Sequence, residues 1–351
     1  MTDKKKIRVL VVDDSAFMRI AVKRTLESDP AIEVIGQGKD GAEAVQLVEQ
    51  LQPDVVTMDF NMPRMNGVEA LRAIFAKRPV PVIMLSAHTQ QGAQETLDAL
   101  AAGALDFVPK PDGEVSTDLS GVRDDLLRKV KGASRSRPSV VPVAPSPVRA
   151  VAPKTERAVR SSLPGDAPLL VIAISTGGPA ALERVIPRLP AGFGAGVVIV
   201  QHMPKAFTRA LASRLDGISA LSVREAEDGD VPVPGQVLIA PGDRHLTLDT
   251  SGRVKLLDSP PVHGCRPAAD VTLQAIARSF GARTTVLVMT GMGKDGALGA
   301  QALKAAGGKV LAQDEASSVV FGMPKAVIER GLADQVIALE RIAPTLIERF
   351  G

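Results

Sequence analysis

The chain has 351 residues, of which 45% are hydrophobic and 23% charged, as in globular proteins with two or three packed domains. The formal charge is only +3 and there is no Trp or Tyr, which argues against nucleic-acid binding. The single cysteine, Cys265, cannot form an internal disulfide, and the apolar run after the basic N-terminus, Ile7–Val12, is too short for a signal peptide or a membrane span. We therefore expect a cytoplasmic protein with no direct membrane insertion.

Residues 1–131 alternate strand and helix patterns five times, which predicts an α/β domain with a doubly wound parallel sheet covered on both faces. The expected strands are Ile7–Val12, Ile32–Ile35, Val55–Phe60, Val80–Leu85 and Leu105–Val108. The expected helices are Phe17–Leu26, Ala42–Leu51, Val68–Lys77, Ala93–Ala102 and Val122–Val130.

Residues 132–167 are rich in proline and keep no helix or strand period, which indicates an interdomain linker. Residues 168–351 form a second doubly wound α/β pattern. Its expected strands are Leu169–Ile174, Val197–Val200, Leu221–Arg224, Val237–Ala240, Thr285–Met289 and Lys309–Ala312, with a hairpin over Thr247–Leu257.

An acidic pocket is predicted at the carboxyl edge of the first sheet. The polar residues that follow its strands are Asp13, Asp14, Asp59, Ser86 and Lys110. Clustered carboxylates repel one another, and a hard divalent cation with oxygen ligands relieves that repulsion. We expect Mg²⁺ there, shielding a phosphate held by the hydroxyl and the ammonium group, with Asp59 as the nucleophile that forms an acyl phosphate. The alternative, that strand-end aspartates cap the next helices, stays open for Asp13 or Asp59 taken alone.

This segment resembles the flavodoxin-like receiver domain of two-component response regulators over essentially its whole length. The residues that carry the resemblance are Asp13–Ser15, Met58–Gly67, Ser86–Ala87 and Pro109–Pro111. The resemblance implies that Asp59 accepts phosphate from a histidine kinase and that Ser86 and Lys110 sense it. It also implies that Mg²⁺ is bound by Asp13, Asp14, Asp59 and the carbonyl of Asn61.

In the second domain, a serine, a histidine and an aspartate each follow the end of a strand. Ser175 ends the run Leu169–Ile174 and precedes two glycines and a helix pattern over Ala180–Arg188. His202 and Asp295 follow later strands in the same way. Carboxyl ends of parallel strands share one edge, where helix N-termini favour developing negative charge. These are the groups that an activated serine needs as nucleophile, base and orienter.

Two alternatives bear on this site. His245 and His263 are further histidines, and His245 could line the same cleft, but His202 directly ends a strand next to that of Ser175 in order. The glycine-rich turns could instead cradle phosphate, although neither matches G-x-x-x-x-G-K-[ST] or G-x-G-x-x-G. The order Ser, His, Asp also differs from that of α/β-hydrolases.

Residues 169–350 resemble the catalytic domain of chemotaxis protein-glutamate methylesterases/glutaminases. The resemblance rests on Ser175–Gly178, Gln201–Pro204, Ile239–Gly242, Arg266–Asp270, Thr290–Gly296 and Val320–Pro324. It implies Ser175 as nucleophile, His202 as base and Asp295 as orienter. It further implies that backbone amides near Met292, with Thr176, stabilise the oxyanion.

The resemblance of the whole chain implies a phosphorylation-activated hydrolase that removes γ-glutamyl methyl esters from chemoreceptors, releases methanol and deamidates selected glutamines. Its expected partners are methyl-accepting chemoreceptors and a chemotaxis histidine kinase, and ester hydrolysis is expected to need no cofactor. One alternative is the same enzyme serving a receptor array with another output. The other is a non-catalytic response regulator that acts by binding, although no basic helix-turn-helix pattern follows residue 169.

Overall fold

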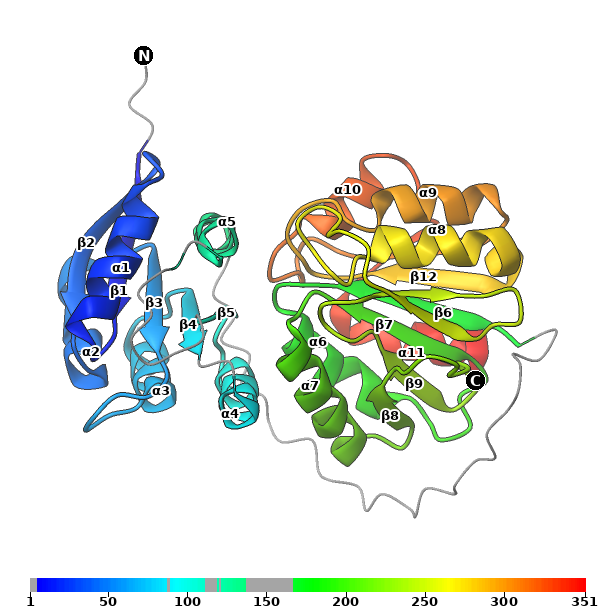
Figure 1. Ribbon diagram of the computed structural model, residues 1–351, viewed down its shortest axis with the longest axis horizontal. Coiled ribbons are helices and arrows are strands. Elements are labelled where there is room, and N and C mark those ends of the chain that lie inside the picture. The colour runs from blue at the N-terminus through cyan, green and yellow to red at the C-terminus, as the bar shows by residue number, and fades with distance from the viewer. Residues whose placement is uncertain (1–4, 87–88, 111–118, 120, 137–166) are drawn as a thin grey trace. The chain divides into compact units, whose positions relative to one another are not determined.

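The computed structural model describes residues 5–86, 89–110, 119, 121–136 and 167–351. Contacts divide the chain into two compact units, Met1–Ala144 and Pro145–Gly351, and each contains its own parallel sheet (Figure 1). Most of the expected linker, residues 137–166, lies outside the described residues. No helix in the described part of the chain is long and apolar enough to cross a membrane.

The first unit has a five-stranded parallel sheet in the order β2-β1-β3-β4-β5. Helix α1 packs against α5 and helix α2 against α3, so that helices cover the sheet. The strands are β1 Ile7–Val12, β2 Ile32–Gly38, β3 Val55–Asp59, β4 Val82–Ser86 and β5 Asp106–Pro109. The helices are α1 Ala16–Glu27, α2 Gly41–Leu51, α3 Gly67–Lys77, α4 Gln90–Ala101 and α5 Arg123–Ala133.

The second unit has a seven-stranded sheet in the order β14-β13-β12-β6-β7-β9-β8, with every pairing parallel. Its strands are β6 Leu169–Ile174, β7 Gly196–Gln201, β8 Ser222–Glu225, β9 Gln236–Ile239, β12 Thr284–Val288, β13 Lys309–Gln313 and β14 Gln335–Ile337. A separate antiparallel hairpin joins β10 His245–Leu248 to β11 Val254–Leu257. The helices are α6 Gly178–Val185, α7 Lys205–Ile218, α8 Ala269–Phe280, α9 Ala297–Ala305, α10 Met323–Ile328 and α11 Leu339–Phe350.

The core of the second unit is built on its central strand. Every residue of β6 is fully buried, and alternate side chains of the strand point to opposite faces. On one face, Leu169, Val171 and Ala173 pack with apolar side chains of α8, α9 and α10 and with the hairpin. Helix α6 contacts both α7 and α11 elsewhere in the unit (Figure 1). Burial on both faces explains why the sequence of β6 is an unbroken apolar run.

Both sheets reverse their winding direction at a central strand. In the second unit the chain leaves β6 for β7 on one side, and β12 later pairs on the other side. In the first unit β1 lies between β2 and β3. Open parallel sheets bind ligands in the crevice outside the carboxyl ends of the strands at such a switch point. Ser175 follows β6 and Asp13 follows β1, so each of these residues lies at that position.

The structure confirms the fold class, two doubly wound parallel-sheet units, and differs from expectation at element ends. Helix α5 continues through Ala133 because Val130 and Ala133 are buried. The helix expected over Ala180–Arg188 ends at Val185 and continues as a short 3₁₀ turn, since Pro187 cannot extend an α-helix. The edge strand β14 was not predicted, because it has three residues and only Ile337 is buried.

Candidate functional site

The turn that follows β6 holds Ser175 in a fixed position. The N–H of Ser175 donates to the carbonyl of Thr290, at 3.0 Å, and its own carbonyl accepts from the N–H of Gly178 at 2.7 Å. The side-chain Nε2 of Gln201 donates to the same carbonyl at 3.1 Å. Gly177 has φ +77°, a left-handed conformation that glycine adopts without strain, and it opens helix α6. Ser175 is therefore buried at the start of a helix, with its backbone fixed from both neighbouring strands.

His202 and Asp295 meet beside this turn. The N–H of His202 donates to the carbonyl of Ile174, the last residue of β6, at 3.2 Å. Its ring Nε2 lies 2.7 Å from Oδ2 of Asp295. The other ring nitrogen, Nδ1, is buried and has no hydrogen-bond partner among the described residues. Because Asp295 accepts the proton on Nε2, the lone pair of a neutral ring lies on Nδ1.

The surroundings of His202 strengthen it as a proton acceptor. Burial by itself lowers the pKa of His202, but the side chains of Cys265 and Asp295 raise the pKa to about 10. A raised pKa makes the neutral ring a stronger base, but at neutral pH, well below that pKa, only a minor fraction of the rings is neutral. Cys265, the single cysteine, is buried, and the sequence interpretation gave it no place in the catalytic site.

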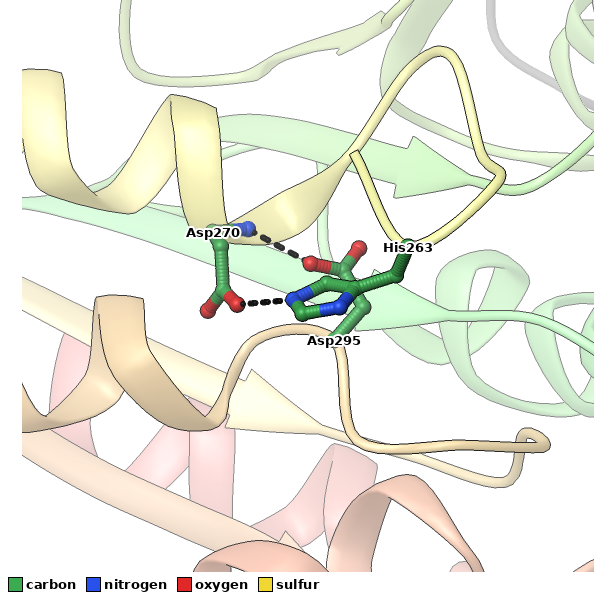
Figure 2. A group of neighbouring side chains, drawn as sticks. All are labelled: His263, Asp270 and Asp295. Atoms are coloured by element: carbon green, nitrogen blue, oxygen red, sulfur yellow. Dashed lines mark hydrogen bonds and ion pairs between the residues drawn. The ribbon is translucent and has the colours of Figure 1, made fainter. Parts of the chain in front are cut away.

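The carboxylate of Asp295 is held by the first turn of helix α8. Its Oδ2 accepts from the N–H of Ala269 at 2.6 Å, and its Oδ1 accepts from the N–H of Asp270 at 2.9 Å. Figure 2 shows the N–H of Asp270 directed at Asp295. Burial raises the pKa of Asp295, but the hydrogen bonds from His202 and from these two N–H groups hold it below its usual range. The residue is thus an anion at neutral pH and can orient an imidazole.

Thr290 connects the glycine-rich loop after β12 to the serine turn. Its hydroxyl donates to the carbonyl of Thr176 at 2.9 Å and accepts from the N–H of Val320 at 3.0 Å. The N–H of Gly291 donates to the carbonyl of Val320 at 3.0 Å. Thr176 is buried and Met292 is half-buried in this region. The loop that carries Met292 is therefore fixed relative to Ser175.

The remaining two histidines of this unit have other partners. His245 is fully buried, its Nδ1 accepts from the N–H of Ala268 at 3.1 Å, and its Nε2 lies 3.1 Å from the carbonyl of Pro260. His245 was left as an alternative that could line the cleft, and with both nitrogens engaged in a fully buried ring it has the contacts of a structural histidine. His263 bonds Asp270, with 2.9 Å between Nε2 and Oδ2. His88 lies outside the described residues.

In the first unit, the predicted acidic residues gather at the ends of β1 and β3. Asp13, Asp14 and Asp59 offer carboxylate oxygens that all lie within 4.8 Å of one another. The Nζ of Lys110 is 2.9 Å from Oδ2 of Asp13 and 2.8 Å from Oδ1 of Asp59. Asp13 and Asp59 are buried and Asp14 is exposed, so the cluster opens toward solvent on one side.

The charge balance of this pocket suits a divalent cation. Burial, together with the neighbouring Asp13, raises the pKa of Asp59 to about 6, although Lys110 acts in the opposite direction. Burial also raises the pKa of Asp13. The three carboxylates and the single ammonium group of Lys110 leave an excess of two negative charges, which a divalent cation bound by oxygen ligands would offset. The donor set therefore fits Mg²⁺.

The other predicted residues of the first unit lie nearby. The hydroxyl of Ser86 donates to the carbonyl of Gly92 at 3.1 Å and accepts from the hydroxyl of Thr96 at 2.5 Å. The carbonyl of Ser86 accepts from the N–H of Lys110 at 2.7 Å. Asn61 is exposed two residues after Asp59. Ser86 is thus bonded to helix α4 rather than turned toward the carboxylates.

Sequence reasoning missed several residues that position these groups. Gln201 and Asp270 were quoted only as parts of motifs, with no role, and Cys265 was treated only as a redox indicator. Gln313, whose side-chain oxygen accepts from the N–H of Thr290 at 2.8 Å, was not singled out at all. All four act through contacts between segments far apart in the chain. A polar residue inside or directly after a buried strand was the one available signal, and it applied to Gln201 and Gln313.

Comparisons with known proteins cover nearly the whole chain. Residues 170–346 match the family model of the CheB methylesterase, and residues 9–116 match that of the response regulator receiver domain. A protein-glutamate methylesterase/protein-glutamine glutaminase of Symbiobacterium thermophilum is 48% identical over 98% of this chain and 97% of the relative. The protein of that name from Thermotoga maritima is 46% identical over 99% of both chains.

A solved structure supports the fold of the second unit. The crystal structure of the Thermotoga maritima CheB methylesterase catalytic domain is similar to 52% of this chain, covering 98% of that domain, with 49% identity and a TM-score of 0.51. Along the chain the receiver match lies ahead of the methylesterase match, and the curated relatives align over nearly their full length. The chain therefore belongs to the CheB methylesterase family, with a response regulator receiver domain ahead of the methylesterase domain.

Proposed function

We propose that this protein hydrolyses γ-glutamyl methyl esters on methyl-accepting chemoreceptors, with Ser175 as nucleophile, His202 as base and Asp295 as orienter. The observation that carries the proposal is the 2.7 Å contact between Nε2 of His202 and Asp295, which leaves the buried Nδ1 as the nitrogen that does not face the carboxylate, at the carboxyl edge next to β6. The names of the curated relatives supply the substrate class.

The two steps of the reaction use the same nitrogen. Nδ1 of His202 takes the proton of the Ser175 hydroxyl as Oγ attacks the ester carbonyl, and the same proton then passes to the departing methanol. Water repeats the sequence on the acyl-enzyme and releases the glutamate carboxylate. Asp295 keeps the proton on Nε2 and stabilises the imidazolium. Deamidation of glutamine, the second activity in the relatives' name, follows the same course with ammonia as leaving group.

Stabilisation of the oxyanion is assigned to backbone amides near Met292, with Thr176 contributing. This assignment is supported by the fixed position of the loop that carries Met292, since the hydroxyl of Thr290 in that loop donates to the carbonyl of Thr176. Donors that are fixed before the reaction stabilise the developing charge without reorganisation.

In the receiver domain we assign phosphorylation to Asp59, with a chemotaxis histidine kinase as donor. Asp13, Asp14, Asp59 and the carbonyl of Asn61 would hold Mg²⁺, which would shield the charge of the incoming phosphate. Lys110 would pair with the phosphate, and Ser86 would exchange its bond to Gly92 for a phosphate oxygen. That exchange would shift helix α4, whose start Ser86 now contacts, and is our candidate for the switch that regulates the hydrolase.

The test is release of methanol from methylated receptor membranes by the full chain, with and without a small-molecule phosphodonor. Ser175→Ala should lower the rate by roughly 10⁴-fold or more, as in other triad enzymes, and His202→Ala should do comparable damage. Asp295→Ala should cost less. A Ser175→Ala variant that keeps more than about a tenth of the wild-type rate would remove Ser175 from the mechanism.

A further inference from the structure

Helices α8 and α9 begin without side-chain caps of their own. Their N-cap residues, Ala268 and Gly296, make no side-chain hydrogen bond to the helix. The first-turn N–H groups of a helix have no partner within the helix and need one from elsewhere. In α8 that partner is Asp295, which directly precedes Gly296 and accepts from Ala269 and Asp270.

Asp270 in turn caps the start of helix α9. It lies in the first turn of α8, yet its Oδ1 accepts from the N–H of Gly299 in the first turn of α9, at 2.7 Å. Its side chain is only 3% exposed. A Cβ on Gly299 would stand 2.5 Å from the Cβ of Leu273 and 3.2 Å from the Cα of Asp270, so a glycine is needed for this close approach. Each helix start is therefore capped by an aspartate that belongs to the other.

His263 completes the contacts of Asp270. Its Nε2 lies 2.9 Å from Oδ2 of Asp270, and Figure 2 shows the imidazole ring directed at that oxygen. The backbone of His263 has φ +53°, a left-handed conformation that is uncommon outside glycine. Such a conformation persists where the surrounding structure imposes it, and here it places the ring next to the buried carboxylate of Asp270.

The cluster of His263, Asp270 and Asp295 has donor atoms within 4.8 Å of one another, as a metal site would. Each of its four carboxylate oxygens, however, already accepts a hydrogen bond from a backbone N–H or a ring nitrogen. A metal ion would have to displace those bonds and release both helix starts. The geometry is that of a hydrogen-bonded support.

We propose that Asp270 and His263 are positioning residues for the reaction, acting through the start of α8 on the carboxylate of Asp295 and so on the ring of His202. The inference rests on the proposed function, because the step it affects is proton transfer at His202. Asp270 fixes the two N–H groups that orient Asp295, and His263 fixes Asp270.

The experiment compares three full-length variants, Asp270→Ala, Asp270→Asn and His263→Ala, by the pH dependence of kcat and KM for methanol release and by an NMR titration of His202. Asp270→Ala should lower kcat about 10- to 100-fold, the range typical when a partner that orients a functional ligand is removed. KM should change little. Because the bond to Asp295 raises the pKa of His202, loosening it should move that titration to lower pH. Asp270→Asn keeps an oxygen for Gly299 and should recover most of kcat.

His263→Ala should lower kcat and the pKa of His202 as well, but by less than Asp270→Ala does. Because His263 is partly exposed, this variant should fold, and it tests the inference by itself if Asp270→Ala does not fold. The control is Asp334→Ala. It removes a carboxylate that accepts from the N–H of Val310, near the N-terminal end of β13 and so away from the carboxyl edge of the sheet. This variant should lose stability without moving the titration of His202. Folded His263→Ala with wild-type kcat and an unmoved titration would overturn the inference. A wild-type protein that releases no methanol would instead refute the proposed function, while the NMR arm would still test the support.

Discussion

Gly291 is predicted to be essential for the placement of Ser175. A Cβ added at Gly291 would stand 2.9 Å from the Cβ of Ser175 and 2.4 Å from the Sδ of Met323. Ordinary contacts of a Cβ begin at 3.4 Å, so the serine must move by about 0.5 Å and the buried thioether by about 1 Å. Bonds to Thr290 and Gln201 hold the serine backbone, which prevents the whole turn from moving aside. Gly291 has no positive φ, so the effect of alanine is one of contact rather than backbone strain.

Since a misplacement of about 1 Å costs about 100-fold in rate, Gly291→Ala should lower kcat about 10-fold. Overpacking should also lower the free energy of unfolding by about 1–3 kcal/mol. The assay is methanol release from methylated receptor membranes, paired with thermal unfolding. Gly217→Ala is the matched control, because no atom lies within 4 Å of a Cβ there and alanine favours the helix. Gly291→Ala with the rate and stability of the wild type would refute the contact argument.

Three further predictions concern the two domains. Asp59→Asn should stay folded but take up no phosphate from a small-molecule donor, whereas wild-type labelling should require Mg²⁺; labelling that survives a chelator would contradict the acidic pocket. Cys265→Ala removes a group that raises the pKa of His202, so the acid limb of the pH–rate profile should move to lower pH, and an unmoved limb would exclude the contact. A fragment that starts at Pro168 should be active without phosphodonor and faster than the unphosphorylated full chain; a slower fragment would show that the receiver assists the hydrolase.

The sequence was most informative where one element specifies its own structure. The unbroken apolar run of β6 followed by Ser175 and two glycines predicts a strand, a tight turn and a helix, because each residue type favours that local conformation. The hairpin turn was predictable for the same reason, since Asp249 bonds the N–H groups of Ser251 and Arg253 two and four residues further on.

Contacts between distant segments were not predictable in this way. Nothing in the local sequence of Cys265 indicates that it interacts with His202, and nothing around Asp270 indicates that it caps another helix. The strand pattern limited the edge on which Ser175, His202 and Asp295 lie. It did not specify which nitrogen of His202 faces Asp295, because that depends on how the start of α8 is packed.

The reciprocal capping of α8 and α9 has a consequence for how this family can be engineered. Functional residues commonly reduce stability, so replacing them often yields a more robust but inactive protein. Asp295 departs from that trade-off, because its carboxylate also satisfies two buried N–H groups. Its removal would leave those donors unpaired, at about 1–3 kcal/mol for each unsatisfied group. Inactive variants made to trap substrates are therefore better made by replacing Ser175 than by replacing Asp295. At position 295, selection for stability and selection for activity favour the same residue.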